Sequence, residues 1–171
     1  MCVREPGSAD WTAAPGLSFR DWLREGGSGA LRAPTSEDLD YHLSTLFPPV
    51  RPRGHMELRM IDAQPGDGWI VPAAVATALA DDERAADAAR AAAEPLWDGP
   101  AHASDAWLRA ARCGPADPQI GRASKQCFEA ADAALGRSGV PVAIRQAVAD
   151  FTERYVLNDR CPADDHLEGI T

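Results

Sequence analysis

The amino-acid sequence changes character at Pro72, and this change limits the folds that the chain can adopt. Residues 1–71 are rich in glycine, proline and aromatic residues and contain short alternating runs, whereas residues 72–171 are rich in alanine. Alternation of polar and apolar residues favours strands, and alanine favours helices. The sequence therefore predicts an α+β fold, with a strand-and-loop part over residues 1–71 and a helical part over residues 72–171.

Start and stop signals predict four helices in the alanine-rich part. Proline at a first helical position loses no hydrogen bond, serine and aspartate cap helix starts, and glycine ends helices. The predicted helices span residues 72–97, 104–112, 118 to 136 or 139, and 141 to about 157. In the last of them an apolar stripe follows helical spacing, which indicates packing rather than ligand binding. The stripe consists of Ile144, Val148, Phe151 and Tyr155.

Charge and length exclude several classes of function. The 171 residues suit one domain with a core, and the net charge of −9 disfavours nucleic acid and anionic membranes as partners. A local group of arginines can still bind a phosphate. No apolar stretch approaches the roughly 20 residues of a membrane span, and the first residues lack the apolar centre of a signal peptide. We therefore expect a cytoplasmic protein with no nucleic-acid or membrane partner.

The cysteines do not indicate a metal site. Cys2, Cys113, Cys127 and Cys161 include no pair with the two-residue spacing typical of zinc ligands. We interpret them as reduced cysteines.

The segment with chemical potential is residues 55–62, HMELRMID, which we predict to form a strand. Side chains alternate between the faces of a strand, so Glu57 and Arg59 share one face. The opposite face is apolar and carries Met56, Leu58 and Met60. The apolar face suits packing on the helical part, and the charged face suits a cleft or water.

Two interpretations of the charged face are open. A carboxylate can bind Mg²⁺ through a hard oxygen and an arginine can bind phosphate oxygens, so Glu57 and Arg59 suit nucleotide chemistry. Arg51 and Arg53 add positive charge just upstream. Alternatively, the charges form a weak surface salt bridge. On spacing alone the second interpretation is favoured, because Glu-x-Arg is a common triplet.

The wider sequence favours the first interpretation. HLSTLFPPVR at residues 42–51, followed by Glu57, Arg59 and Asp62, resembles the glutamate–cysteine ligase family. The resemblance is to its plant-like branch, and most closely to the enzymes of bacterial ergothioneine biosynthesis. It also includes the segments LSFRDWL at 17–23, PTSED at 34–38 and RCPADD at 160–165. It therefore spans most of the chain, with residues 42–62 as its most specific part.

This resemblance implies a fold and a reaction. The family's fold is similar to the catalytic domain of glutamine synthetase, in which an antiparallel sheet forms a cleft and helices back it. ATP phosphorylates the γ-carboxylate of glutamate, and the amino group of cysteine attacks the acyl phosphate. The implied substrates are glutamate and cysteine, and the implied cofactors are ATP and Mg²⁺.

The resemblance also implies roles for individual residues. Glu57 matches a Mg²⁺ ligand of the family, and Arg59 matches an arginine beside the nucleotide phosphates and the substrate. We expect Arg59 and Arg51 to act in catalysis, and Arg59 and Arg53 to contact the nucleotide.

Other residues near the motif have structural interpretations. For Asp62, a structural role at the strand end is an equal alternative to a role in the site. We interpret His42 as a hydrogen-bonded structural histidine, and Leu46 and Phe47 as core residues.

The chain differs from family enzymes because it lacks strands that carry metal-binding carboxylates. Family enzymes are longer, and their other metal-binding carboxylates lie on strands that have no counterpart here, while residues 1–4 resemble the middle of a family strand. We therefore expect residues 1–171 to be one partial catalytic domain, inactive alone: a fragment, a split-gene product that needs a separate N-terminal polypeptide, or a chain with a wrongly assigned start. Two alternatives are a non-catalytic helical interaction module and a related carboxylate–amine ligase that uses another amine.

Overall fold

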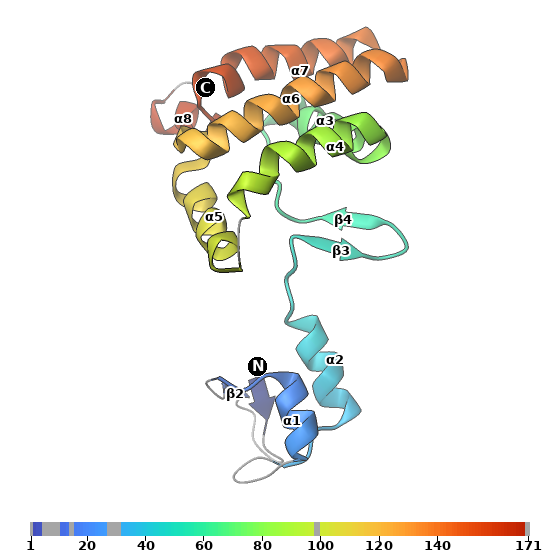
Figure 1. The fold of residues 1–171 in the computed structure, drawn as a ribbon, viewed down its shortest axis with the longest axis vertical. Helices are drawn as coiled ribbons and strands as arrows, with labels where there is room; N and C mark the ends of the chain where they lie inside the picture. Colours follow the sequence, from blue (N-terminus) through green and yellow to red (C-terminus); the bar gives the residue numbers. More distant parts are fainter. Residues whose placement is uncertain (1, 5–10, 14–15, 27–31, 98–99, 170–171) are drawn as a thin grey trace. The chain divides into compact units, whose positions relative to one another are not determined.

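The computed structural model describes residues 2–4, 11–13, 16–26, 32–97 and 100–169 (Figure 1). The chain divides into two compact units, Met1–Met60 and Ile61–Thr171. The combination of helices with small antiparallel sheets confirms the predicted α+β class. Within the described ranges, no helix has both the length and the apolar character needed to cross a membrane.

The described part of the first unit contains two short antiparallel sheets and two helices. Strand β1 pairs with β2, and β3 pairs with β4. The elements are β1 (Cys2–Arg4), β2 (Trp11–Ala13), α1 (Phe19–Glu25), α2 (Ser36–Ser44), β3 (Val50–Pro52) and β4 (Met56–Leu58). The strand predicted at residues 55–62 is confirmed for Met56–Leu58. Helices α1 and α2 were not predicted.

Local capping explains both unpredicted helices. The Ser18 hydroxyl accepts a hydrogen bond from the backbone N–H of Asp21 at the start of α1. At the start of α2, Thr35 and Asp38 each accept a hydrogen bond from the other's backbone N–H, which forms a capping box. Trp22 of α1 is 1% exposed. Side-chain caps, the buried Asp38 and the buried Trp22 indole therefore hold these short helices.

The second unit is a helical assembly. It contains η1 (Gly66–Trp69), α3 (Ile70–Asp81), α4 (Glu83–Ala93), η2 (Glu94–Leu96), α5 (Pro100–Cys113), η3 (Gly114–Ala116), α6 (Pro118–Ser138), α7 (Val142–Arg154), η4 (Val156–Asn158) and α8 (Pro162–Leu167). Helix α6 packs against α3, α4 and α7 and so forms the centre of the unit (Figure 1). Helix α8 was not predicted.

The structure corrects the first predicted helix of this unit. Instead of one helix over 72–97, the chain forms α3 and α4, with a break at Asp82, whose backbone is extended. The Asp82 carboxylate accepts a hydrogen bond from the Ala85 backbone N–H and binds the guanidinium of Arg137 on α6 at 2.8–3.0 Å. The break is therefore stabilised by a residue far away in the sequence.

The observed ends of the other helices agree with the predicted ends to different degrees. Helix α6 begins after the cap Asp117 and ends at Gly139, whose φ is +70°, as predicted. Helix α5 begins at Pro100, earlier than the predicted cap, and α7 ends at Arg154 rather than near residue 157.

The core of the helical unit is built mainly from small side chains. Alanines supply half of its buried residues, so the helices approach closely. The buried residues are Val71, Val75, Ala78, Ala85, Ala131, Ala134, Leu135 and Val148. Phe128 and Phe151 pack at its side as stacked rings with centroids 5.7 Å apart. Val148 and Phe151 confirm the predicted apolar stripe of α7.

Candidate functional site

The β3–β4 hairpin presents the charged residues of the predicted site. In its register Arg51 lies directly opposite Glu57, so both side chains project from the same face. Gly54 makes the connection possible with a φ of +78°, which favours glycine. The backbone N–H of Arg59 donates to the carbonyl of Pro49 at 2.8 Å and extends the pairing beyond β4.

Arg51 and Glu57 form a two-pronged ion pair. Arg51 Nε donates to Glu57 Oε2 at 2.7 Å, and Nη2 donates to Oε1 at 3.0 Å. Arg59 Nε lies 3.9 Å from Oε1. The hydrogen bond from Arg51 lowers the pKa of Glu57, and the charges of Arg51, Arg59 and Arg53 lower it further. Glu57 is therefore ionised at neutral pH.

Phe47 holds the second arginine of the cluster. The guanidinium carbon of Arg59 lies 5.2 Å from the centre of the Phe47 ring, a cation–π arrangement. The prediction that Leu46 and Phe47 belong to the core is wrong, because both are exposed, Phe47 at 74%. The ring instead lies against the charged face of the hairpin.

The hairpin cluster consists of Phe47, Arg51, Arg53, Glu57 and Arg59. Arg53 is exposed, and its side chain has no hydrogen-bond or ion-pair partner among the residues that the structure describes. The charges of three arginines act on the one carboxylate of Glu57, so the cluster is positive within a strongly acidic chain. This charge balance suits a phosphate or another anion.

The donor set fits Mg²⁺ only in part. In the described part of the chain, no three His, Cys, Asp or Glu side chains lie close enough together to bind a metal ion. The Glu57 side chain is 34% exposed. Each carboxylate oxygen has a second lone pair that the Arg51 fork leaves available. Because Mg²⁺ typically uses one or two protein carboxylates beside phosphates and water, Glu57 fits as one ligand.

His42 and Asp62 lie outside this cluster of contacts. His42, in the last turn of α2, stacks on Phe19 with ring centroids 5.1 Å apart. Its Nδ1 is buried without a hydrogen-bond partner in the described residues, so stacking rather than hydrogen bonding positions the ring. Asp62 follows β4, and its side chain is exposed.

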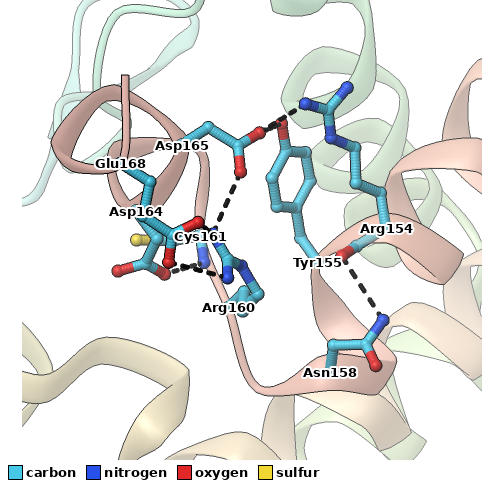
Figure 2. A network of polar contacts seen from close by, with 8 residues as sticks. All are labelled: Arg154, Tyr155, Asn158, Arg160, Cys161, Asp164, Asp165 and Glu168. Atoms are coloured by element: carbon cyan, nitrogen blue, oxygen red, sulfur yellow. Dashed lines mark hydrogen bonds and ion pairs between the residues drawn. The ribbon is translucent and has the colours of Figure 1, made fainter. Parts of the chain in front are cut away.

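The segment 160–165 has a structural explanation in the second unit (Figure 2). Asp165 is 7% exposed and accepts hydrogen bonds from Tyr155 Oη at 2.6 Å, Arg154 Nη2 at 2.6 Å and Arg160 Nη2 at 3.1 Å. The same Nη2 of Arg160 donates to Glu168 Oε2 at 2.7 Å. The Tyr155 hydroxyl contributes most to the lowered pKa of Asp165. This network holds α8 at the end of α7.

One polar cluster of the first unit was missed by sequence reasoning. Arg32 Nη1 and Nη2 each donate to an oxygen of buried Asp38 at 2.6 Å, and the indole N–H of Trp22 donates to the Arg32 carbonyl at 2.7 Å. The available signal was the capping pattern of Thr35 and Asp38. These contacts link the two segments 17–23 and 34–38, because Arg32 binds both Trp22 of α1 and Asp38 of α2.

Comparisons with known proteins agree with the family resemblance of the sequence. The model of glutamate-cysteine ligase family 2 (GCS2) matches residues 4–167. The glutamate–cysteine ligase EgtA of Mycobacterium tuberculosis is 39% identical over 176 residues, which cover 99% of this chain and 37% of that protein. EgtA of Mycolicibacterium smegmatis is 37% identical over 154 residues, which cover 90% of this chain and 33% of that protein. No solved structure matches the chain.

The chain thus spans about a third of the length of these relatives. The family match nevertheless extends from β1 through the hairpin to α8, and so covers both units. The resemblance that the sequence motif indicated is confirmed: this chain belongs to glutamate-cysteine ligase family 2.

Proposed function

We propose that this chain supplies part of the catalytic unit of an ATP-dependent glutamate–cysteine ligase. In the proposed reaction the γ-carboxylate of glutamate attacks the γ-phosphorus of ATP, and ADP leaves. The amino group of cysteine then displaces phosphate from γ-glutamyl phosphate and loses a proton, giving γ-glutamylcysteine. The relatives are glutamate–cysteine ligases, which supports glutamate and cysteine as the substrates. In this proposal the complete enzyme acts in the cytoplasm, in ergothioneine biosynthesis.

The observation that carries the proposal is the positive hairpin cluster. A guanidinium has five N–H donors, and the pairing with Glu57 occupies two nitrogens of Arg51, so donors remain for phosphate oxygens. We assign Arg51 and Arg59 to the transferring phosphoryl group, because fixed positive charge stabilises the transition state of phosphoryl transfer. Arg59 and Arg53 contact the nucleotide phosphates.

Glu57 has two roles in this proposal. It orients Arg51 through the ion pair, and it offers one oxygen ligand to Mg²⁺. When bound, Mg²⁺ neutralises the phosphate oxygens. Phe47 keeps the Arg59 guanidinium in place through its ring face. Exposed arginines without such supports adopt many rotamers, so these two contacts pre-organise the positive charge.

The proposal includes a fold for the complete enzyme. We infer that residues 1–171 belong to one catalytic domain, partial in this chain, with a glutamine-synthetase-like antiparallel sheet to which the strands of residues 1–71 contribute. The helices of residues 72–171 would back that sheet. The part of the relatives' length that this chain does not span, about two thirds, would contribute the other metal ligands.

The test measures phosphate release with glutamate, cysteine, ATP and Mg²⁺, omitting each in turn. The chain alone should show no turnover, because one carboxylate cannot hold the metal and the substrates. Addition of the N-terminal two thirds of a relative should give turnover that needs both amino acids. Robust cysteine-dependent turnover by the chain alone, or none in a stable complex of the two parts, would contradict the proposal.

Substitution of Glu57 tests the site in the complemented enzyme. Glu57→Gln keeps the shape but removes the charge, so turnover should fall by orders of magnitude while the melting temperature barely changes. Glu37→Gln, an identical change at an exposed position of α2, is the matched control and should leave turnover unaltered. Near-normal turnover of Glu57→Gln at saturating Mg²⁺ would show that Glu57 is only a surface charge.

A further inference from the structure

The helical unit contains a groove that the proposed ligase site does not use. It lies between α3, the C-terminal end of α6 and the beginning of α7, and its volume is about 540 Å³. This volume is in the range of small-molecule sites. Its wall is apolar and is formed by Trp69, Ile70, Ala73, Leu135, Val140 and Ile144. We call it the α3–α7 groove.

One end of the α3–α7 groove is polar and negatively charged. Thr77 and Asp81 both line it and stand four residues apart on α3, so they are neighbours on one helix face. Neither side chain has a hydrogen-bond or ion-pair partner among the residues described by the structure. The adjacent Asp82, in contrast, is paired with Arg137 at 2.8 Å. The groove therefore carries one carboxylate whose charge is uncompensated.

The apolar wall and the polar end are separated along α3. Ile70 and Asp81 mark the two ends of the helix, and with a rise of 1.5 Å per residue they lie about 16 Å apart. Trp69, beside Ile70, is 59% exposed and offers its indole surface. A ligand that fills the groove must therefore be apolar over most of its length and must carry its polar group at one end.

We propose that the α3–α7 groove binds a small organic cation with an apolar body and a terminal ammonium group. The body removes apolar surface from water along Ile70, Ala73 and Leu135. The ammonium has three N–H donors, which match the acceptors of Asp81 and Thr77. Arg137 and Asp82 also line the groove, but they pair with each other, so the charge of Asp81 is left over and disfavours a carboxylate or phosphate at this end.

Three probes that share an eight-carbon chain test the charge preference. The 171-residue chain is titrated by isothermal calorimetry with n-octylammonium, 1-octanol and octanoate at neutral pH. Charged hydrogen bonds are stronger than neutral ones, so n-octylammonium should bind about tenfold more tightly than 1-octanol. Octanoate should bind most weakly. Equal affinity for the three probes, or no binding of n-octylammonium, would overturn the proposal.

Two variants locate the binding. Asp81→Asn removes the charge with little change of shape and should abolish the preference for n-octylammonium over 1-octanol. Asp132→Asn makes the same change at an exposed position of α6 that does not line the groove, and it should bind like the wild type.

Ala73→Leu fills the groove from an exposed position of α3 and should weaken both n-octylammonium and 1-octanol. Unchanged circular dichroism would show that each variant is folded. Wild-type affinity of Ala73→Leu, or an undiminished preference in Asp81→Asn, would place the binding elsewhere and refute the assignment.

Discussion

Helix α6 contains two internal glycines whose replacement by alanine should have opposite effects. An ideal Cβ on Gly121 would lie 2.4 Å from the carbonyl oxygen of Pro115 and 2.6 Å from Oδ1 of Asp159. An ideal Cβ on Gly136 would meet nothing nearer than the Arg145 guanidinium, at 3.7 Å. Gly121 is thus required by a close approach of backbone to α6, whereas Gly136 is not.

The expected magnitudes follow from these distances. Alanine is favoured over glycine within a helix by about 1 kcal/mol, because it restricts the unfolded chain and supports helical geometry. At Gly136 this gain is unopposed, so Gly136→Ala should raise the free energy of unfolding by about 0.5–1 kcal/mol. At Gly121 the new methyl displaces a backbone carbonyl, and overpacking of this kind costs about 1–3 kcal/mol. Gly121→Ala should therefore lower it by about 1–2 kcal/mol.

Urea unfolding followed by far-ultraviolet circular dichroism measures both variants, because most of the helical signal comes from the second unit. The comparison is internal, since the same substitution is made twice in one helix. A Gly121→Ala protein that is as stable as the wild type would show that η3 and the turn at Asp159 do not approach α6 as described. A destabilised Gly136→Ala would refute the helix-propensity argument.

Two further predictions follow from side-chain contacts. The pKa of Asp165 is lowered from its ordinary 3.8, so the contribution of this carboxylate to stability is present above that pH and is lost as pH falls through the folded pKa. In melting curves recorded from neutral pH to below pH 3.8, Asp165→Asn should lose less stability on acidification than the wild type, and an identical pH dependence would contradict this. In the complemented ligase, Phe47→Leu should raise the KM for ATP because Arg59 loses its ring support, whereas Phe47→Tyr should retain it; equal KM values for the two would exclude the positioning role.

The hairpin shows how far the sequence alone determines a candidate site. Alternation along 55–62 predicted that Glu57 and Arg59 share one face, and Arg59 Nε does lie 3.9 Å from Glu57 Oε1, although β4 itself ends at Leu58. The position of Arg51 opposite Glu57 depends on the pairing register. Register follows from the loop length and from the left-handed conformation of Gly54, which a strand pattern does not contain.

Among the helices, too, some boundaries follow from neighbouring residues and others from residues far away in the sequence. Helix α6 was predictable because a capping Asp-Pro start and a terminal glycine act on the neighbouring backbone. The break between α3 and α4 was not, because Asp82 stands in an acidic run that equally suits a solvated helix face. Its extended conformation is held by Arg137, 55 residues later in the sequence. Tertiary contacts of this kind override local preference.

The exposure of Phe47 has a consequence for the chemistry of the hairpin. An aromatic residue among leucine and prolines is typical of a core, and burial would have left Arg59 dependent on Glu57 alone. In the structure the two arginines instead have different partners. Glu57 pairs closely with Arg51, at 2.7 Å, and lies 3.9 Å from Arg59. The Arg59 guanidinium lies over the Phe47 ring. Loss of the Glu57 charge therefore releases Arg51 more than Arg59. The two arginines have separate supports, so in the proposed ligase substitutions at Glu57 and at Phe47 should impair different phosphate contacts rather than the same one.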